Sequence, residues 1–320
     1  MHVLQVLSSA VLGGIEQVNC DYAKLLIARG HQVTLLMRPE AESLSHARST
    51  GAEILLDRVA VQPWGGFNPW KWAKYRRLIH DRCVDAVLMH NGKAERLFSR
   101  ASRGLCPVIG VSHNDNFQSR ARMDGVFCVN SRMRELFIAR AGALWSDRPA
   151  IVMPNPLSMS IKPPQPWIPN VFKRPFVMGT LCRMVSKKGL HLLIEAAAQL
   201  KSSGRDFRIV MGGDGIERHA LELLRDQRGL RNEVYFPGWI QNRLQFFSEI
   251  DVFCLPSTIE PFGLVLTEAM FCGRPVVTSD ADGPWDIVRP EETGLMVPRG
   301  EAAALATAID RLMTNPELGI

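Results

Sequence analysis

Two carboxylates in the second half of the chain could bind a ligand that carries hydroxyl groups. They begin and end the segment Glu260-Pro-Phe-Gly-Leu-Val-Leu-Thr-Glu268. Pro261 and Gly263 predict that Glu260 lies in a loop and that a helix begins there, with Glu268 about two turns further on. A carboxylate beside a helix N-terminus accepts hydrogen bonds from hydroxyls, and the free amides attract phosphate or polar sugar groups. The alternative is that Glu260 is a solvated loop residue.

Two cations, Arg183 and Lys188, follow the apolar run 176–181, and Gly189 comes directly after them. A strand, a cationic loop and then a helix form a phosphate-binding arrangement, in which arginine offers a fork and lysine a point charge. Such cations neutralise the charge that develops on a departing diphosphate without a metal ion. The alternative is that both are ordinary surface cations.

The first half of the chain offers a glycine pair and a histidine, each at the end of an apolar run. Gly13-Gly14 follows residues 3–7, and His113 follows residues 108–111. Paired glycines let the backbone approach a bound group closely, although a tight turn explains them equally well. The spacing is not Gly-x-Gly-x-x-Gly, which disfavours a nicotinamide enzyme. A histidine at the carboxyl end of a strand is a candidate for a functional role.

Other chemistries find little support. Asp280-Ala-Asp282 resembles a metal-binding Asp-x-Asp, but it leads into Gly283-Pro284, which predicts a loop, and the phosphate-binding cations make a metal unnecessary. We therefore expect no metal site. The seven cysteines are scattered and form no Cys-x-x-Cys pair, so neither a disulfide framework nor a zinc site is indicated. A phosphate-binding P-loop and a Gly-x-Ser-x-Gly nucleophile motif are both absent.

The elements that must position these residues alternate along the chain. Short apolar runs, typical of buried strands, alternate with amphipathic stretches, which predicts parallel sheets with right-handed crossovers. The predicted strands are 3–7, 32–37, 86–89, 108–111, 126–129, 176–181, 208–211, 234–236, 252–255 and 276–278, and the predicted helices include 17–29, 189–202, 217–227 and 263–271. Seven prolines between residues 154 and 175 exclude a helix or a central strand and predict an interdomain linker.

Charge is divided unevenly between the halves. Residues 1–170 hold 21 Lys and Arg against 13 Asp and Glu, a net +8, whereas the remainder holds 17 against 19, a net −2. A basic first half suggests an anionic surface or acceptor, and the alternative is a solvated basic surface. The segment 71–77 (KWAKYRR) mixes aromatic residues with cations, as an interfacial helix does. No nucleic-acid-binding motif accompanies these charges, so we expect no nucleic-acid partner.

The start of the chain, residues 1–12, is apolar, and we interpret it as a buried strand rather than a signal peptide because it lacks a basic leader and a cleavage pattern. No run approaches the roughly 20 apolar residues that a membrane span needs. The scattered cysteines and the lack of a signal peptide or a membrane span predict a cytoplasmic protein. The basic first half suggests a peripheral position at the inner face of the membrane as the alternative.

In their order along the chain, these motifs resemble those of glycosyltransferase family 4. The likeness covers nearly the whole chain. It rests on Gly13-Gly14, His113, Val152-Met-Pro-Asn155, Arg183 with Lys188-Gly189, Gly213-Asp-Gly215, Phe236-x-Gly238, Leu255-Pro-Ser257, the two glutamates Glu260 and Glu268, and Gly273-x-Pro-Val-Val277. The resemblance implies an α/β fold of GT-B type, in which two Rossmann-like, doubly wound parallel-sheet domains face a central cleft. The implied domains are an acceptor-binding domain over 1–156, a Pro-rich linker over 157–175 and a nucleotide-sugar-binding domain over 176–320.

The resemblance also implies roles for individual residues. Arg183 and Lys188 would hold the donor diphosphate, helped by amides near Gly13 and Gly14. Glu260 would bind hydroxyls of the transferred sugar, and His113 would approach that sugar from the first domain. The remaining donor contacts would come from Phe262, Gly263 and Leu264 through backbone amides, from Glu268 to the ribose, and from Gly238, Trp239 and Ile240 near the base.

These roles describe a retaining, metal-independent hexosyltransferase that uses a UDP- or GDP-linked sugar and needs no cofactor. Its acceptor would be a glycan or an anionic, lipid-linked molecule, as in bacterial lipopolysaccharide core or capsule synthesis. Two features depart from the family pattern. Asp282-Gly-Pro-Trp-Asp-Ile-Val288 replaces the usual Gly-Gly-(Pro or x)-x-Glu-Ile-Val, which leaves the identity of the sugar open. The chain also stops at Ile320, where family members continue into a helix that crosses back to the first domain.

The alternatives are therefore a non-catalytic relative that binds sugar nucleotides and a nucleotide-sugar epimerase of the same fold. A phosphorylase would need a pyridoxal-binding lysine, for which the sequence offers no convincing candidate.

Overall fold

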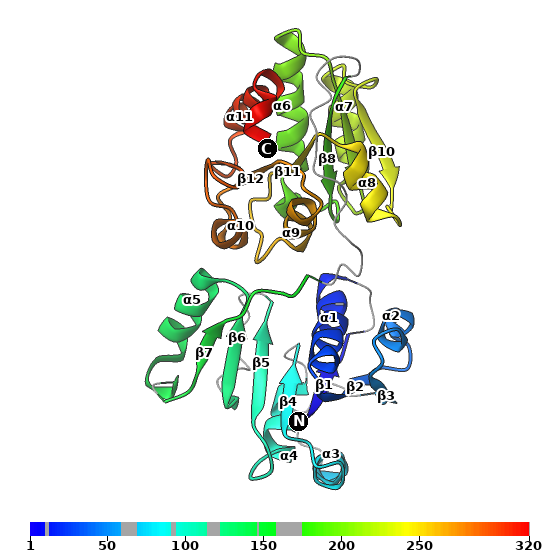
Figure 1. Ribbon diagram of the computed structural model, residues 1–320, viewed down its shortest axis with the longest axis vertical. Helices are drawn as coiled ribbons and strands as arrows, with labels where there is room; N and C mark the ends of the chain where they lie inside the picture. Colours follow the sequence, from blue (N-terminus) through cyan, green and yellow to red (C-terminus); the bar gives the residue numbers. More distant parts are fainter. Residues whose placement is uncertain are drawn as a thin grey trace. The chain divides into compact units, whose positions relative to one another are not determined.

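The computed structural model describes residues 1–9, 13–58, 69–90, 94–113, 122–145, 147–157 and 175–319. The chain divides into two compact units, Met1–Ser158 and Met159–Ile320 (Figure 1). Most of the Pro-rich segment predicted as a linker, 158–174, lies outside the described residues. No helix in the described part of the chain is long and apolar enough to cross a bilayer.

The first unit is built on a seven-stranded parallel sheet in the order β3-β2-β1-β4-β5-β6-β7. Its strands are β1 (His2–Leu7), β2 (Gln32–Met37), β3 (Glu53–Leu56), β4 (Ala86–Met89), β5 (Val108–Ser112), β6 (Gly125–Cys128) and β7 (Ala150–Val152). All six residues of β1 are buried, as expected of a strand that is covered on both faces. Since β1 lies between β2 and β4, the strand order reverses at the β1/β4 boundary, which is where ligands bind in open α/β sheets.

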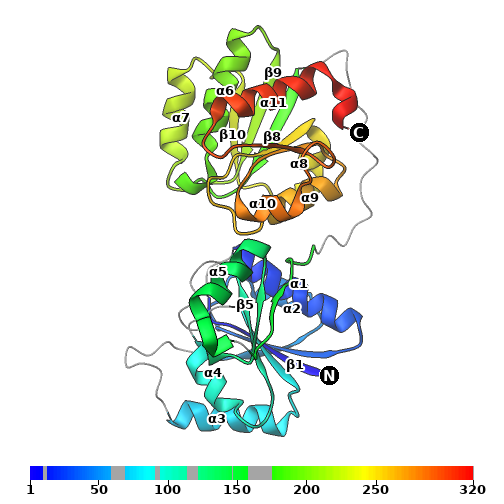
Figure 2. The ribbon, with the colours of Figure 1, turned by 90° about the vertical axis from the view of Figure 1, so that its left-hand side faces the viewer.

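The helices of this unit are α1 (Gly14–Ala28), α2 (Leu44–Arg48), α3 (Pro69–Asp81), α4 (Glu95–Ala101) and α5 (Ser131–Ala141), followed by a 3-10 turn, Gly142–Trp145. Figure 2 shows α1 and α2 on one side of the sheet and α3 and α4 on the other, as right-handed crossovers require. Cys20 and Ala23 of α1 pack with Leu35 and Met37 of β2 in one core. Tyr75 of α3 packs against Phe98 of α4, with ring centroids 4.9 Å apart, on the other side.

The second unit repeats the scheme with six parallel strands in the order β10-β9-β8-β11-β12-β13. The strands are β8 (Phe176–Leu181), β9 (Phe207–Gly212), β10 (Val234–Gly238), β11 (Val252–Leu255), β12 (Val276–Ser279) and β13 (Leu295–Val297). The helices are α6 (Leu190–Ser202), α7 (Arg218–Gln227), α8 (Arg243–Glu249), α9 (Leu264–Phe271), α10 (Asp282–Ile287) and α11 (Ala302–Thr314), with 3-10 turns at Ser186–Lys188 and Pro316–Gly319. The order again reverses between β8 and β11.

Strand β11 shows how one apolar run serves two cores. Val252 and Cys254 point into the core beneath α6 and α11, whereas Phe253 and Leu255 point into the core beneath α8 and α9. This alternation is the two-residue period of a β-strand. The predicted α/β class with two doubly wound parallel sheets is therefore confirmed.

Some element bounds differ from the predictions. Helix α1 begins at Gly14, three residues before the predicted start, because a glycine pair can open a helix without a side-chain cap. Strands β3, β7 and β13 were not predicted, since each is only three or four residues long and lies at or next to a sheet edge. The predicted loop at Asp282-Gly283-Pro284 is wrong: these residues form the first turn of α10, where a proline is tolerated because the first-turn amides need no helical partner.

Candidate active site

The central feature of the second unit is an ion pair between Lys188 and Glu260. Lys188 ends the 3-10 turn that follows β8, and Glu260 lies in the loop that follows β11. The Lys188 Nζ contacts Glu260 Oε2, and the two side chains are only 16% and 9% exposed. The Ser257 hydroxyl donates to the same carboxylate oxygen at 3.3 Å. Because β8 and β11 flank the reversal of strand order, the pair stands where an α/β sheet binds its ligand.

The two loops are joined by their backbones as well. The Thr258 amide donates to the Lys187 carbonyl oxygen at 2.9 Å, and the Thr258 hydroxyl donates to the same oxygen at 3.2 Å. Gly189 follows Lys188 with φ +62°, and a Cβ there would lie 2.1 Å from the Pro256 carbonyl oxygen. Only glycine fits this position, which explains the Lys188-Gly189 pair in the sequence.

Glu260 is also connected to the helices that follow it. Its carbonyl oxygen accepts from the Gly283 amide at 2.8 Å. A Cβ on Gly283 would lie 2.4 Å from backbone atoms of Phe262, so the start of α10 packs directly on the loop. Gly263, with φ +100°, caps α9 without a side-chain hydrogen bond, and Leu264 is the first helical residue. The loop thus holds the buried Phe262 beside a helix N-terminus at which the described residues form no side-chain capping hydrogen bond.

Glu268 lies one turn after Leu264 on α9, is 9% exposed, and forms an ion pair with Arg243. Arg243 is the first residue of α8. Nothing in the sequence spacing pointed to this arginine, because its partner lies 25 residues away on a different helix. The contact holds the Glu268 carboxylate in place while leaving Arg243 itself 41% exposed.

Arg183 behaves differently from Lys188. Its side chain is exposed and forms no hydrogen bond or ion pair with another residue of the described ranges. Its backbone is nevertheless held, since the amides of Cys182 and Met184 donate to the carbonyl oxygens of Gly212 and Asp214 at 3.1 and 2.8 Å. The loop therefore carries one cation, Lys188, that is engaged with Glu260, and two exposed cations, Arg183 and Lys187. Burial raises the pKa of the neighbouring Cys182 thiol to about 11, so that it is protonated and a poor nucleophile at neutral pH.

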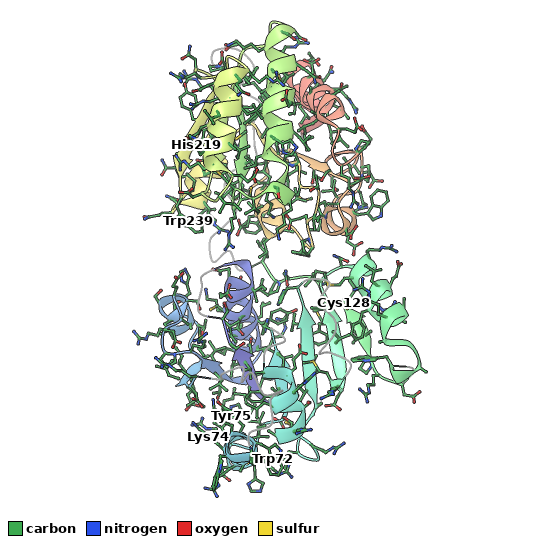
Figure 3. All side chains as sticks on the ribbon, turned by 180° about the vertical axis from the view of Figure 1, so that it is seen from behind. Trp72, Lys74, Tyr75, Cys128, His219 and Trp239 are labelled. Carbon is green, nitrogen blue, oxygen red and sulfur yellow. The ribbon has the colours of Figure 1, made fainter. Side chains whose placement is uncertain are left out.

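The predicted base-side residues lie at the end of β10. Gly238 is its last residue, and its carbonyl oxygen accepts from the Gly213 amide at 2.7 Å. The Trp239 side chain is 65% exposed (Figure 3), whereas Ile240 packs against the core beneath α8 and α9. The structure does not bring these three residues into contact with Lys188 or Glu260 through any hydrogen bond within the described residues.

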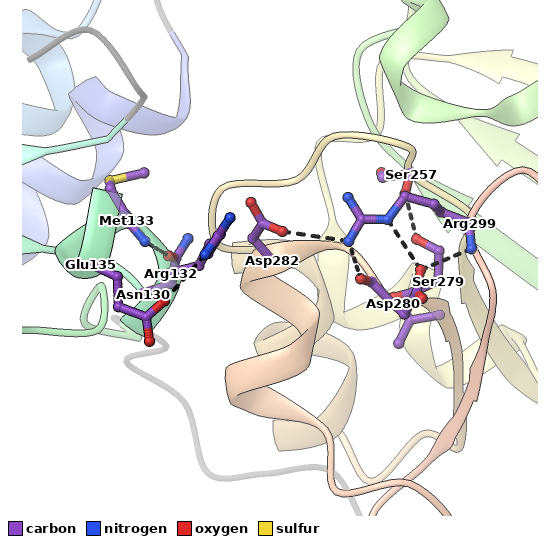
Figure 4. Close-up of polar contacts among 10 residues, drawn as sticks. Asn130, Arg132, Met133, Glu135, Ser257, Ser279, Asp280, Asp282 and Arg299 are labelled. Carbon is purple, nitrogen blue, oxygen red and sulfur yellow. Dashed lines mark hydrogen bonds and ion pairs between the residues drawn. The ribbon is translucent and has the colours of Figure 1, made fainter. Parts of the chain in front are cut away.

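The Asp280-Ala-Asp282 motif is occupied by an arginine (Figure 4). Arg299 donates to Asp280 Oδ1 from its backbone at 2.8 Å and from Nε at 3.1 Å, and it contacts Asp282 Oδ1 at 3.4 Å. Ser279, next to Asp280, donates its hydroxyl to the Ser257 carbonyl oxygen. The two aspartates are therefore part of the scaffold behind Ser257 and Glu260.

In the first unit, the glycine pair and the histidine are placed around the β1/β4 reversal. Gly13 is the N-cap of α1 and Gly14 its first helical residue, and among the described residues no capping hydrogen bond from a side chain is found at that end. His113 follows β5 and is 9% exposed. Its Nε2 lies 3.3 Å from Nδ1 of His90, which follows β4. Sequence reasoning missed His90, although it stands at a strand end just as His113 does.

The fold and the site together define a class of α/β proteins. It has two doubly wound sheets, and a lysine–glutamate pair lies where the strand order of the second sheet reverses, between β8 and β11. Residues 12–159 match the family model described as Glycosyltransferase Family 4, and residues 162–319 match the one described as Glycosyl transferases group 1. The chain therefore belongs to glycosyltransferase family 4, whose fold is GT-B, and it is a glycosyltransferase by family.

Among curated relatives, the phosphatidyl-myo-inositol mannosyltransferase of Mycobacterium leprae is 28% identical over 96% of this chain and 86% of its own length. The alpha-D-kanosaminyltransferase of Streptomyces kanamyceticus is 37% identical, but the alignment covers 45% of this chain and 38% of that protein. The lipopolysaccharide core biosynthesis glycosyltransferase LpsD of Rhizobium meliloti is 38% identical over 45% of this chain and 40% of its own. The last two alignments thus span about two fifths of the relatives' length.

Solved structures agree on the fold. The Anabaena protein Alr3699/HepE, in complex with UDP, superposes with a TM-score of 0.81 and 23% identity over 100% of this chain and 92% of that one. A glycosyltransferase from Rickettsia africae superposes with a TM-score of 0.84 and 19% identity, covering 99% and 90% of the two chains. At these identities the likeness is one of fold.

Proposed function

We propose that the protein is a retaining hexosyltransferase that takes its sugar from a UDP- or GDP-linked donor. The observation that carries the proposal is the Lys188–Glu260 pair at the β8/β11 switch point. A cation for the diphosphate and a carboxylate for sugar hydroxyls are what a nucleotide sugar needs from adjacent loops. A relative of the same fold, Anabaena Alr3699/HepE, is described in complex with UDP-glucose, which supports this class of donor.

Each site residue then has a role in the proposal. Lys188 and the exposed Arg183 bind the diphosphate, and the uncapped N-terminus of α9 adds the amides of Phe262, Gly263 and Leu264. Glu260 accepts hydrogen bonds from the sugar. Glu268, held by Arg243, binds the ribose, and the Gly238–Ile240 segment, with Trp239 exposed, lies near the base. In the first unit, the candidate ligand-binding residues are Gly13, Gly14 and His113, and we assign the acceptor to this unit.

In the proposed mechanism the bond between the anomeric carbon and the diphosphate oxygen breaks as the acceptor oxygen attacks from the same face. The acceptor's proton passes to the departing diphosphate, and the sugar passes through an oxocarbenium-like state. Lys188 and Arg183 neutralise the charge that gathers on the diphosphate. We assign no metal to this step, which is consistent with the engagement of Asp280 and Asp282 by Arg299.

The acceptor we propose is a glycan or an anionic, lipid-linked molecule, as in lipopolysaccharide core or capsule synthesis. Helix α3 supports a surface of this kind. Trp70 is 85% exposed and Trp72 40% exposed, and Arg77 on the same helix is exposed. Figure 3 shows Trp72 and Lys74 on this helix. Exposed tryptophans among cations are typical of helices that lie on a membrane surface, and a peripheral position on the cytoplasmic side would follow.

A panel of nucleotide sugars in a thermal-unfolding assay tests the donor, with the Lys188→Ala variant as the control for site-specific binding. We expect one donor to raise the Tm of the wild-type protein and to leave that of the variant unchanged. Incubation of that donor with and without glycan acceptors then separates the alternatives. A non-catalytic binder is stabilised without turnover, and an epimerase converts the donor with no acceptor present.

A further inference from the structure

The turn between β12 and α10 is held by one arginine, Arg299, which lies between β13 and α11 (Figure 4). Its backbone amide and its Nε donate to Asp280 Oδ1 at 2.8 and 3.1 Å. One terminal nitrogen of the guanidinium donates to the Asp280 carbonyl oxygen and also lies 3.4 Å from Asp282 Oδ1. A guanidinium presents its donors in a rigid fork, so these contacts fix Asp280 and Asp282 relative to each other.

The same turn holds the loop that carries Glu260. On the strand side of the turn, the Ser279 hydroxyl donates to the Ser257 carbonyl oxygen. On the helix side, the Gly283 amide donates to the Glu260 carbonyl oxygen at 2.8 Å. A Cβ on Gly283 would lie 2.4 Å from backbone atoms of Phe262, so the helix and the loop are in direct contact there. Because the loop is attached on both sides of the turn, a shift of the turn also shifts Glu260.

The ion pairs of Arg299 contribute little to the stability of the fold. The side chains of Arg299, Asp280 and Asp282 are 45%, 37% and 44% exposed, and solvent screens pairs of this kind. Their effect on geometry is larger, because a displacement of about 1 Å at a reacting centre lowers a rate about 100-fold. A substitution of Arg299 is therefore expected to separate activity from stability, whereas a residue that serves only the fold lowers activity through the amount of folded protein.

We infer that Arg299 is a positioning residue: it fixes the turn before α10, and through Ser279 and Gly283 this turn determines where the Glu260 carboxylate lies. The inference rests on the proposed function, in which Glu260 binds the sugar hydroxyls. It adds to the site a residue that acts without touching the substrate and to which no sequence motif pointed. It also gives the Asp280-Ala-Asp282 motif a role, because this motif is the anchor of Arg299.

Hydrogen exchange of the Gly283 amide tests the inference without any substrate. NMR spectra of the full chain, labelled with 15N and deuterium, give its exchange rate. We expect at least an about tenfold faster rate in Arg299→Met, because the hydrogen bond to Glu260 opens more often when the turn is not held. Arg205→Met is the matched control and should leave the rate unchanged: Arg205 precedes β9, is 38% exposed and forms a two-point ion pair with Asp310 of α11. An unchanged rate in Arg299→Met would overturn the inference whether or not the protein transfers sugar.

Turnover with the nucleotide sugar that raises the Tm of the wild type tests the effect on Glu260. In Arg299→Met we expect kcat to fall about 10- to 100-fold, the scale of a misplaced catalytic group. The affinity for free UDP or GDP, measured by calorimetry, should stay within about threefold, because Lys188 lies on a different loop.

Arg299→Lys separates position from charge, because it keeps the positive charge but lacks the fork, and we expect its kcat to be at least about fivefold below wild type. Full activity of this variant would show that only the charge matters. A kcat within about twofold of wild type for folded Arg299→Met would equally contradict the positioning role. A wild type that transfers no sugar would refute the proposed function instead, and the exchange rates would still decide whether Arg299 holds the turn.

Discussion

Replacing Lys188 with alanine is the substitution that tests the proposed site most sharply. The side chain is 16% exposed, and its Nζ contacts the carboxylate of Glu260, which is 9% exposed. In the proposed mechanism the same ammonium group neutralises the departing diphosphate. The substitution therefore removes one positive charge that would stabilise the transition state. It also removes one of two contacts to the Glu260 carboxylate and leaves the hydrogen bond from the Ser257 hydroxyl.

The two effects have different magnitudes and different measurements. Loss of one preorganised donor to a developing anion raises the activation free energy by about 2–4 kcal/mol, which lowers kcat/KM about 30- to 1,000-fold. Removing one member of a buried ion pair destabilises a protein by up to about 3–5 kcal/mol, and we expect the lower part of that range because Lys188 retains some contact with solvent. Initial rates of sugar transfer report the first effect, and thermal unfolding without ligand reports the second.

Lys187→Ala is the matched control, because Lys187 carries the same charge one residue earlier and its side chain is exposed. Its part in the loop is a backbone carbonyl oxygen that accepts from Thr258, and the substitution leaves that bond in place. We expect the control to keep kcat/KM within about twofold of wild type, measured at a temperature at which both proteins are folded. If Lys188→Ala also transfers sugar within about threefold of wild type, Lys188 does not neutralise the leaving group and the site assignment is wrong.

Four further substitutions, two in each unit, have expected outcomes. Glu260→Gln should lower kcat by at least about tenfold while tightening the binding of the free nucleoside diphosphate, measured by calorimetry; weaker binding would contradict this. Arg243→Met should raise the donor KM with little change in kcat, because the Glu268 carboxylate loses its ion-pair partner. Arg77→Glu should weaken binding to anionic vesicles about 30-fold, at about 1 kcal/mol per unit of charge, and leave zwitterionic vesicles unaffected; equal binding to both vesicle types would exclude the surface of α3. Burial raises the pKa of Tyr22 from 10.0 to about 12, so its contribution to stability is full below pH 10 and is lost as pH rises toward 12; Tyr22→Phe should flatten that decline in alkaline unfolding curves.

The fold could be predicted because the signal lies in local, repeated patterns. A continuous apolar run such as β8 is what a strand buried on both faces requires, and its bounds, Phe176–Leu181, agree with the prediction. The short strand β13, Leu295–Val297, gives no such run and was missed. Asp282 shows the opposite error: Gly283-Pro284 indicates a loop by composition, but the packing of Gly283 on Phe262 makes this segment the first turn of a helix.

The residues of the candidate site also divide into those that have a local sequence signal and those that are defined by tertiary contacts. Lys188 and Glu260 were each predicted from the strand or helix beside them, and strand order then determines that their loops are neighbours. The contact between them could be inferred only by assuming a fold. Arg243 gave no local signal, because its partner Glu268 is 25 residues away on another helix. His90 follows a strand as His113 does, but the contact between the two rings spans 23 residues and is defined by tertiary structure alone.

In the proposed mechanism, the Lys188–Glu260 contact lets the site bind an anion without carrying an unpaired buried charge when the anion is absent. Glu260 neutralises Lys188 in the ligand-free protein, and Ser257 and the Gly283 amide hold the carboxylate residue in place. In that mechanism the arriving diphosphate competes with Glu260 for the ammonium group, and the carboxylate that is released accepts hydrogen bonds from the sugar. The diphosphate gains negative charge as the glycosidic bond breaks, so its attraction to Lys188 grows along the reaction coordinate. An interaction that strengthens toward the transition state accelerates the reaction, whereas one that only binds the substrate does not. For this reason the nucleotide affinity and the turnover of the Glu260→Gln variant are expected to change in opposite directions.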